Sequence, residues 1–240
     1  NGATSGAGVL ATFSYDNLGR RTQLSRAGGN GAITTYAFDP ASRLATLTQN
    51  FSGTTSDLTR TLDYNAGAQI VERESSNAAY NTPTPYTGTT NYLDNGLNQY
   101  TGITQAQPTY DARGNMTRVG LSTYSYDIFN RLTSATPAGA SQATFAYDAL
   151  GRLRESVASS TTTRFLYDGA QVIGEYNGSN ALQRRYVFGP GVNEPLVWYE
   201  GAGASDRRWL IGDERGSVIA VTNSSGAATN VNAYDEYGVP

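Results

Sequence analysis

The sequence predicts an all-β fold of consecutive antiparallel β-hairpins, and three observations support this prediction. A short motif, Tyr-Asp-x-x-Gly-Arg, recurs along the chain, with its acidic or equivalent position at 16, 39, 65, 94, 111, 127, 148 and 168. Aromatic residues before the copies alternate with small or polar residues, which is typical of strands. The composition favours strands and turns, with 27 Gly and 17 Tyr but only one Met. Such a short period indicates stacked supersecondary units rather than separate domains.

The copies of the motif differ in completeness. The full copies are Tyr15-Asp16-Asn17-Leu18-Gly19-Arg20 and Tyr147-Asp148-Ala149-Leu150-Gly151-Arg152. Looser copies are Phe38-Asp39 with Arg43, Tyr110-Asp111 with Gly114, Tyr126-Asp127 with Arg131, and Tyr167-Asp168-Gly169. Degenerate copies are Tyr64-Asn65, Leu93-Asp94, Asp213 with Gly216, and Tyr234-Asp235 with Gly238.

Each copy predicts a tight turn between two strands. Asp suits the first position of a type I turn, where its side chain accepts backbone N–H groups, and Gly suits the fourth. Gly19 and Gly151 are expected to adopt positive φ and to form the bulge of a short hairpin loop. Strands are expected before the turns at 12–15, 124–126 and 144–147, with returning strands at 20–24, 131–133 and 152–155. About ten hairpins result, and capping explains the aspartates without catalysis.

The arginine after each turn has two interpretations. The arginines could form a binding stripe, or they could pair with the aspartate of the same or the adjacent hairpin. We favour pairing because stacked copies bring opposite charges together at each rung. Exposed pairs contribute only about 0–1 kcal/mol, so they would set register more than stability.

The array is expected to be single over 1–240, more divergent at 52–108 and rich in aromatic residues at 184–240. Two further hairpins are expected there, pairing 186–188 with 196–199 and 207–211 with 217–221. Both tryptophans of the chain, Trp198 and Trp209, lie in this part. Their density indicates either a thicker core or a ligand site, and we favour the core.

Charge and composition argue against several classes of function. The 17 basic and 20 acidic residues are interspersed, so nucleic-acid binding is not expected. No segment approaches the roughly 20 apolar residues that span a bilayer. With no Cys and no His, thiol catalysis, imidazole triads and the usual transition-metal sites are excluded. Calcium-loop signatures are absent too, so neither a metal nor another cofactor is expected.

An enzymatic role would require a pair of carboxylates, as in glycosidases. The candidates are Asp213-Glu214, Asp235-Glu236, Glu194 and Glu200. Nothing in the sequence selects a pair, so we expect no enzyme and no catalytic residue. Exposed aromatic rows could instead bind glycans, although period-two placement favours packing within a sheet.

The residues together resemble the RHS/YD-repeat family. Besides the repeats, the segments that carry the resemblance are Tyr186-Val-Phe-Gly-Pro-Gly, Glu194-Pro-Leu-Val-Trp-Tyr, Asp213-Glu-Arg-Gly-Ser-Val and Tyr234-Asp-Glu-Tyr-Gly. In that family, which includes insecticidal toxin complexes and teneurins, a spiralling sheet forms a hollow shell, and in polymorphic toxins this shell encloses a toxic C-terminal domain. The resemblance therefore implies a structural segment, a shell or β-solenoid-like arc, of a secreted or surface-exposed bacterial protein with an enclosed C-terminal passenger.

The sequence departs from the family pattern near its end. The expected Asp-Pro-x-Gly core motif does not occur before Pro240, so no self-cleaving aspartate is assigned. The chain begins at Asn1, and both ends are expected to be boundaries within a longer polypeptide. An alternative hypothesis is an adhesive or filament-forming extracellular repeat protein that binds glycans or further copies of itself through sheet edges.

Overall fold

The computed structural model describes residues 8–26, 32–81, 89–104, 106–234 and 238. In this part of the chain it contains 21 β-strands and one short 3-10 helix, η1 (Ala78–Tyr80). Strands adjacent in sequence are adjacent in the sheets, and the registered pairs run antiparallel. The prediction of an all-β fold of consecutive antiparallel hairpins is therefore confirmed.

The chain divides into two compact units. Unit 1 comprises residues 1–85 and 186–240, and unit 2 comprises residues 86–185. The expectation of one array over 1–240 stays a prediction. The boundary at 185 falls within β17 (Leu182–Phe188).

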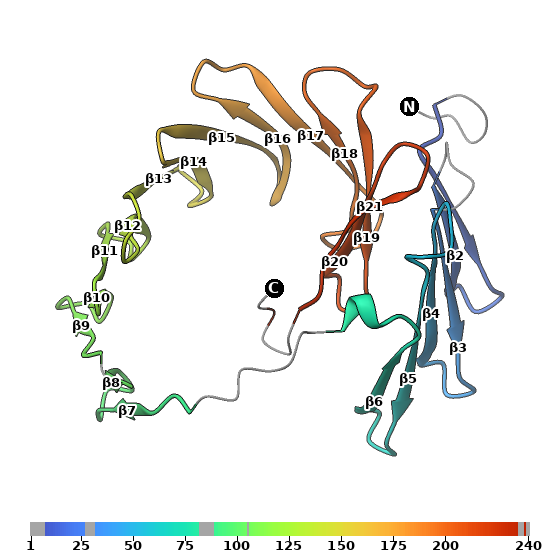
Figure 1. Ribbon diagram of the computed structural model, residues 1–240, viewed down its shortest axis with the longest axis horizontal. Helices are drawn as coiled ribbons and strands as arrows, with labels where there is room; N and C mark the ends of the chain where they lie inside the picture. The colour runs from blue at the N-terminus through green and yellow to red at the C-terminus, as the bar shows by residue number, and fades with distance from the viewer. Residues whose placement is uncertain (1–7, 27–31, 82–88, 105, 235–237, 239–240) are drawn as a thin grey trace. The chain divides into compact units, whose positions relative to one another are not determined.

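Unit 1 contains two groups of strands in sequence order (Figure 1). The first is a six-stranded sheet of β1 (Ala11–Tyr15), β2 (Arg21–Arg26), β3 (Ile33–Phe38), β4 (Leu44–Asn50), β5 (Leu58–Tyr64) and β6 (Ile70–Ser75). The second consists of β18 (Pro195–Glu200), β19 (Arg207–Gly212), β20 (Val218–Thr222) and β21 (Ala228–Val231). Strands β17 to β20 match the two hairpins predicted in the aromatic-rich part.

Unit 2 is a simpler succession of hairpins. Its strands are β7 (Tyr92–Asp94), β8 (Tyr100–Ile103), β9 (Thr109–Tyr110), β10 (Met116–Val119), β11 (Ser122–Tyr126), β12 (Leu132–Thr136), β13 (Ala143–Tyr147), β14 (Leu153–Ala158), β15 (Thr161–Asp168) and β16 (Gln171–Asn177). Strands β7 and β8 form a two-stranded sheet of their own. They lie in the part of the chain where the sequence repeat is most divergent.

A one-residue bulge recurs just after the repeat turns. Ser14 pairs with Gln23 and Tyr15 with Arg21, which leaves Thr22 without an opposing residue. The same shift occurs in the pairs β3–β4, β5–β6, β11–β12, β13–β14 and β19–β20. A bulge bends its strand and increases the local twist. The repeat therefore prescribes a bend as well as a turn.

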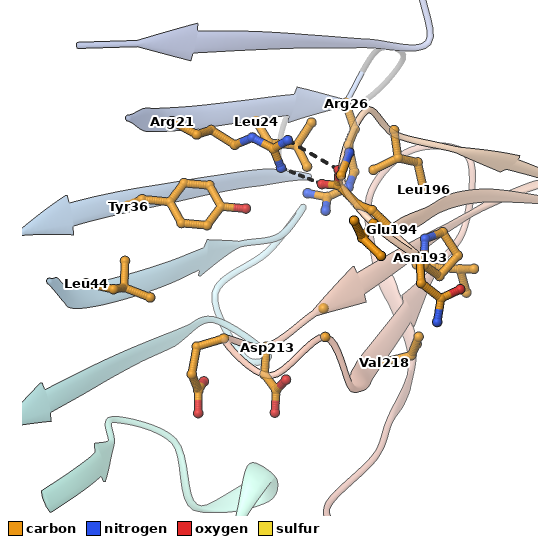
Figure 2. Close-up of a pocket in the computed structure, with 17 residues that line it drawn as sticks. Arg21, Leu24, Arg26, Tyr36, Leu44, Asn193, Glu194, Leu196, Asp213 and Val218 are labelled. Carbon is orange, nitrogen blue, oxygen red and sulfur yellow. Dashed lines mark hydrogen bonds and ion pairs between the residues drawn. The ribbon is translucent and has the colours of Figure 1, made fainter. Parts of the chain in front are cut away.

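The two strand groups of unit 1 pack face to face. Side chains alternate between the faces of a strand, and in β5 the residues Leu58, Arg60 and Leu62 are buried in turn. Leu24 and Arg26 on β2 lie opposite Leu196 on β18 (Figure 2). Arginines thus share the inner face with the apolar residues.

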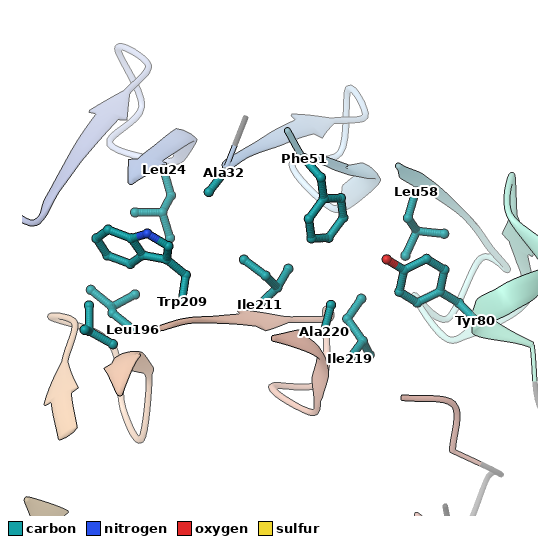
Figure 3. Packing of buried hydrophobic residues seen from close by; sticks show 11 residues of the cluster. Leu24, Ala32, Phe51, Leu58, Tyr80, Leu196, Trp209, Ile211, Ile219 and Ala220 are labelled. Carbon is teal, nitrogen blue, oxygen red and sulfur yellow. The ribbon is translucent and has the colours of Figure 1, made fainter. Parts of the chain in front are cut away.

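An apolar core fills the centre of this interface. Leu24, Phe51 and Leu58 on the first group face Trp209 and Ile211 on β19 (Figure 3). The other members of the cluster are Ala32, Tyr80, Leu196, Val197, Ile219 and Ala220. The Trp209 side chain is 0% exposed. The core interpretation of the aromatic-rich segment is therefore confirmed for Trp209.

Candidate functional site

The repeat turns share one hydrogen-bond geometry. In the first turn the Asp16 N–H donates to the Arg20 carbonyl at 3.0 Å, and the Gly19 N–H donates to the Asp16 carbonyl at 3.0 Å. Asp16 Oδ1 also accepts the N–H groups of Leu18 and Arg20, at 3.0 and 2.9 Å. In the described residues, the same pair of backbone bonds forms around Asp16, Asp39, Asn65, Asn95, Asp111, Asp127, Asp148, Asn177, Asp213 and Asn223.

The fourth residue of each such turn has positive φ. Glycine occupies this position at Gly19, Gly114, Gly151, Gly216 and Gly226, with φ of 75°, 87°, 81°, 86° and 83°. Asn130 takes the same conformation, with φ of 61°, in the turn of Asp127. Glycine pays little for this conformation, and Asn tolerates it better than most other residues. The predicted turn glycines therefore lie where positive φ is required.

Backbone donors perturb the acidity of the capping carboxylates. The N–H of the arginine four residues later holds the pKa of Asp16, Asp39 and Asp148 below its ordinary value. At Asp111 the Asn115 side chain is the first cause of a lowered pKa. These carboxylates are therefore charged in neutral solution, which suits turn capping.

Four turns carry an arginine that pairs with its own aspartate. An oxygen of the aspartate lies 2.7 Å from a guanidinium nitrogen in the pairs Arg20–Asp16, Arg131–Asp127 and Arg152–Asp148, and 2.6 Å in Arg43–Asp39. Pairing within one hairpin was one of the two arrangements expected. The side chains are 17–31% exposed, so solvent screens them only in part.

The same arginines stack on the next hairpin. The guanidinium carbons of Arg20, Arg43, Arg131 and Arg152 lie 4.6, 4.6, 4.7 and 4.7 Å from the ring centroids of Phe38, Tyr64, Tyr147 and Tyr167. Where that ring is a tyrosine, its hydroxyl donates back to the first residue after the arginine, at 2.7–2.8 Å. We call this arrangement the arginine–tyrosine ladder. It connects these four hairpins to the hairpins that follow them, and where the ring is a tyrosine the contacts run in both directions.

The structure places some predicted copies differently. Beside Asp94 the capping side chain is that of Asn95, whose Oδ1 accepts the N–H groups of Leu97 and Gln99. Asp168 pairs directly with Gln171 across a two-residue turn, so the prediction of a repeat turn there is wrong. Its neighbour Gly169 supplies positive φ in that shorter turn. Asp235 lies outside the described residues.

Two capped turns were not predicted. Asn177 and Asn223 each accept two backbone N–H groups through Oδ1, as the aspartates do. Asn177 is followed by Gly178, and Asn223 by Gly226 at the fourth position. An Asn-Gly pair and an Asn-x-x-Gly spacing are turn signals, so a search that accepted Asn equally with Asp would have found both.

Arg21 and Glu194 connect the two strand groups of unit 1. The Arg21 guanidinium pairs with both carboxylate oxygens of Glu194 (Figure 2). The Gly191 N–H donates to Glu194 Oε2 at 2.9 Å. A Cβ at Gly189 would lie 2.5 Å from the same oxygen, so this glycine permits the approach of the carboxylate.

A series of buried hydrogen bonds between polar side chains lies beside the Arg21–Glu194 pair. Arg26 donates to Thr34 Oγ1 at 2.8 Å, Thr34 donates to Gln49 Oε1 at 2.6 Å, and Gln49 donates to the Gly212 carbonyl at 2.8 Å. Burial lowers the pKa of Arg26 to about 10. This hydrogen-bonded series borders a cavity of about 300 Å³ that Arg21, Tyr36 and Glu194 also line (Figure 2).

A second charged group gathers around the turn that begins at Asp213. Arg73 on β6 lies 3.1 Å from Asp213 Oδ2 and 2.6 Å from Glu214 Oε1. Arg60 on β5 lies 3.8 Å from Glu214 Oε2. The carboxylates considered for glycosidase chemistry, Asp213, Glu214 and Glu194, therefore face arginines of the opposite strand group. Glu200 lies 3.6 Å from Arg208.

The described residues contain neither a cluster of metal-ligating side chains nor a helix of membrane-spanning length. Within the described ranges, no three Asp, Glu, Cys or His side chains gather closely enough to hold a metal ion. The one helix of the described chain, η1, has 3 residues, and no described helix has the length and apolar character to cross a bilayer.

Comparison with known proteins agrees with this architecture. A family model described as the teneurin YD-shell matches residues 8–239. The tRNA3(Ser)-specific nuclease WapA of Bacillus spizizenii is 30% identical over 156 residues, and the tRNA nuclease WapA of Bacillus subtilis is 27% identical over 156 residues. Each match covers 63% of this chain but only 6% of the relative.

Solved structures show the same fold. The Photorhabdus luminescens Tc holotoxin pore matches 96% of this chain with a TM-score of 0.59 at 12% identity. The crystal structure of TcdB2-TccC3 matches 96% with a TM-score of 0.61 at 13% identity. The chain spans 16% of each of those chains. The family model that matches residues 8–239 confirms the resemblance to the YD-repeat family.

Proposed function

Because the chain belongs to the teneurin YD-shell family, we propose that it is a wall segment of a β-sheet shell that encloses and presents a C-terminal toxin or other passenger of a secreted bacterial protein. The observation that carries the proposal is the arginine–tyrosine ladder. At three junctions between successive hairpins it combines an ion pair, a stacked ring and a returning hydrogen bond, as at Arg152 and Tyr167. At a fourth junction Arg20 pairs with Asp16 and stacks on Phe38.

Such a wall acts sterically. Backbone hydrogen bonds between successive strands leave few free donors or acceptors within the sheet, so a passenger behind it is separated from solvent and from host targets. No chemical step by this chain is needed. The nuclease names of the WapA relatives describe whole proteins, of which this chain spans 6%. We assign the chain a structural role, with the passenger as its partner and an extracellular or cell-surface location.

Protease protection tests the proposal. The complete reading frame that encodes this chain is expressed, and the intact protein is treated with a nonspecific protease. The passenger is expected to persist in the intact protein and to be digested after the shell is opened by denaturant. A matched control expresses the passenger without the repeat region. Equal digestion of the passenger in both proteins would contradict enclosure.

An exposed edge and an exposed aromatic pair favour a second candidate, an adhesive or filament-forming repeat protein. Ile70 and Val71 on β6, at the edge of the six-stranded sheet, are 43% and 62% exposed. Exposed apolar edge strands can pair with further chains. The rings of Tyr92 and Tyr100 lie 5.1 Å apart and are 55% and 43% exposed, a surface on which a sugar could stack. Light scattering at rising protein concentration tests this candidate. It requires that the wild-type protein form assemblies larger than the monomer, and that Val71→Lys abolish this assembly.

A further inference from the structure

The first hairpin of the six-stranded sheet lacks a neighbour that later hairpins of the arginine–tyrosine ladder have. Its aromatic residue, Tyr15, directly precedes the turn aspartate. At the equivalent position of later copies, the arginine of the preceding hairpin stacks on the rings of Phe38, Tyr64, Tyr147 and Tyr167. Within the described ranges, no arginine lies over Tyr15 and its hydroxyl has no hydrogen-bond partner. The ladder therefore begins with an unfilled position.

Exposure distinguishes Tyr15 in the same way. Tyr15 is 53% exposed. The aromatic residues at the equivalent position of later described copies are all half-buried, namely Phe38, Tyr64, Tyr110, Tyr126, Tyr147 and Tyr167. An aromatic ring contributes a large apolar surface when it is covered, so the open Tyr15 ring can accept a further packing group.

Tyr15 also lies on a free edge strand. Strand β1 is the first strand of the six-stranded sheet, and in the described part of the chain it pairs on one side only, with β2. The backbone N–H and C=O groups on its other side are therefore available for pairing. The β1 sequence, Ala-Thr-Phe-Ser-Tyr, contains none of the charged residues or prolines that commonly protect such an edge. Backbone and ring thus offer together the contacts that a preceding hairpin makes elsewhere in the array.

We propose that the free edge of β1 and the Tyr15 ring bind a further hairpin of the repeat type, whose turn has the pattern Asp-x-x-Gly-Arg. The occupant belongs to the same shell wall, so this assignment rests on the proposed function. Continuity with the ladder supports it, because the junctions Arg20–Phe38 and Arg43–Tyr64 extend along the same sheet from the hairpin that contains Tyr15.

The junction between β14 and β15 shows how the hairpin is held. There the second strand of one hairpin pairs antiparallel with the first strand of the next, Arg152 stacks on Tyr167, and the Tyr167 hydroxyl donates to the Leu153 carbonyl. By the same arrangement, the second strand of the incoming hairpin pairs with β1 and its arginine stacks on Tyr15. The Tyr15 hydroxyl then donates to the carbonyl of the residue after that arginine. The arginine brings its own aspartate, so docking carries no unpaired charge to the edge.

Hydrogen exchange of the full chain with an added hairpin tests the proposal. A copy of residues 143–158, which includes Asp148 and Arg152, is placed before Asn1, where the linkage gives it a high effective concentration at β1. We expect the amides of residues 11–15 to exchange about 10-fold more slowly than in the unextended chain, because an edge strand that gains a partner hydrogen-bonds its free N–H groups.

Two variants show whether the ring and the arginine hold the added hairpin. Arg152→Gln in the added copy should remove most of the protection, and it leaves the original chain unchanged. Tyr15→Leu should have the same effect, and the two changes together should cost little more than either alone because they remove one contact. The matched control is Tyr92→Leu on β7, since Tyr92 is 55% exposed and lies in another sheet, and this variant should keep the protection.

The other outcomes overturn the proposal. Exchange of residues 11–15 at the same rate with and without the added hairpin does so, as does protection that survives both Arg152→Gln in the copy and Tyr15→Leu. Light scattering of the unextended chain tests a second copy as the occupant: self-association that Tyr15→Leu abolishes would assign the edge to that copy and not to a wall hairpin. Protection of the passenger from protease is a separate readout. Digestion of the passenger contradicts enclosure, whereas unprotected β1 amides contradict the docking of a hairpin.

Discussion

Arg152 joins two hairpins of unit 2 by contacting both at once. Its Nη2 lies 2.7 Å from Asp148 Oδ2 in its own turn, and its guanidinium carbon lies 4.7 Å from the centroid of the Tyr167 ring in the next hairpin. The Tyr167 hydroxyl donates to the Leu153 carbonyl at 2.7 Å, beside the arginine. The ion pair fixes the guanidinium plane, which lets the ring stack on it. Turn capping and sheet growth are thereby coupled.

Replacing both partners of this stack should reveal a favourable coupling. We expect Arg152→Gln and Tyr167→Leu each to destabilise the chain, and the double variant to be less destabilised than their sum by about 0.5–1 kcal/mol, because a stacked guanidinium contributes that much at a partly exposed site. Urea unfolding of the four proteins measures the coupling. Arg154→Gln, on the same strand and exposed, is the control and should stay within about 0.5 kcal/mol of the wild type. Strict additivity would mean that the stack contributes nothing.

The capping aspartates should make the chain sensitive to acid. The backbone N–H of Arg152 is the first cause that lowers the pKa of Asp148, and the ion pair with Arg152 acts in the same direction. A carboxylate whose folded pKa is depressed contributes stability above its unfolded pKa of about 3.9, and that stability is lost as pH falls through the folded pKa. The urea midpoint should therefore decline as pH falls below about 4.

Asp148→Asn isolates the part of this decline due to charge. Asn65, Asn95, Asn177 and Asn223 cap equivalent turns, so the amide should preserve the turn while removing the titrating group. We expect a shallower dependence of the unfolding free energy on pH in the variant than in the wild type. The measurement is a series of urea midpoints from neutral pH into the acid range. Parallel curves for the two proteins would exclude a contribution from Asp148.

Gly189 should be intolerant of a side chain because of Glu194. A Cβ at this position would approach Glu194 Oε2 to 2.5 Å and Cδ to 2.8 Å, while the carboxylate is held by Arg21 and by the Gly191 N–H. We expect Gly189→Ala to destabilise the chain by about 1–3 kcal/mol through this overpacking. Gly96→Ala, where a Cβ meets no atom within 4 Å, is the matched control.

A double variant separates the clash from other effects of the alanine. In Glu194→Ala the carboxylate is gone, so adding Gly189→Ala should cost much less than it does in the wild type. Thermal denaturation of the four proteins provides the comparison. If Gly189→Ala is equally costly in both backgrounds, its effect lies in the backbone and not in the contact with Glu194.

The sequence predicted the turns well because their determinants are local. Asp16, Gly19 and Arg20 act within five residues of one another, so their spacing predicts the cap and the positive φ. For the arginine it predicts pairing with an aspartate, but not whether that aspartate belongs to the same or the adjacent hairpin. The errors at Asp94 and Asp168 are also local. Each of these two copies has only some of the motif residues at the expected spacing. In the copy at Asp94 the next residue, Asn95, caps the turn, and in the copy at Asp168 a two-residue loop connects the strands.

Contacts between elements could not be predicted in this way. The stacking of Arg43 on Tyr64 depends on the register of the next hairpin, which a bulge shifts by one residue. The approach of Arg73 to Glu214 joins positions 141 residues apart, and nothing in either local sequence indicates the other. From their residue type, the charged residues on β5 and β6 would be expected at the surface. In the structure the second strand group covers some of them. Burial by distant strands, rather than residue type, creates these pairs.

Trp209 provides the sharpest test of the two-layer packing in unit 1. Its side chain is 0% exposed between the strand groups and packs in the same cluster as Leu24 and Ile211. We expect Trp209→Ala to destabilise the chain by about 3–5 kcal/mol, because it removes a large buried side chain and leaves a cavity. Leu150→Ala is the control, since Leu150 is 77% exposed and should contribute little. Fluorescence gives an independent readout in the Trp198→Phe background, where Trp209 should emit at short wavelength and resist acrylamide quenching. Ready quenching of Trp209 in the folded protein, or a small cost for Trp209→Ala, would contradict the packing of β19 against the six-stranded sheet.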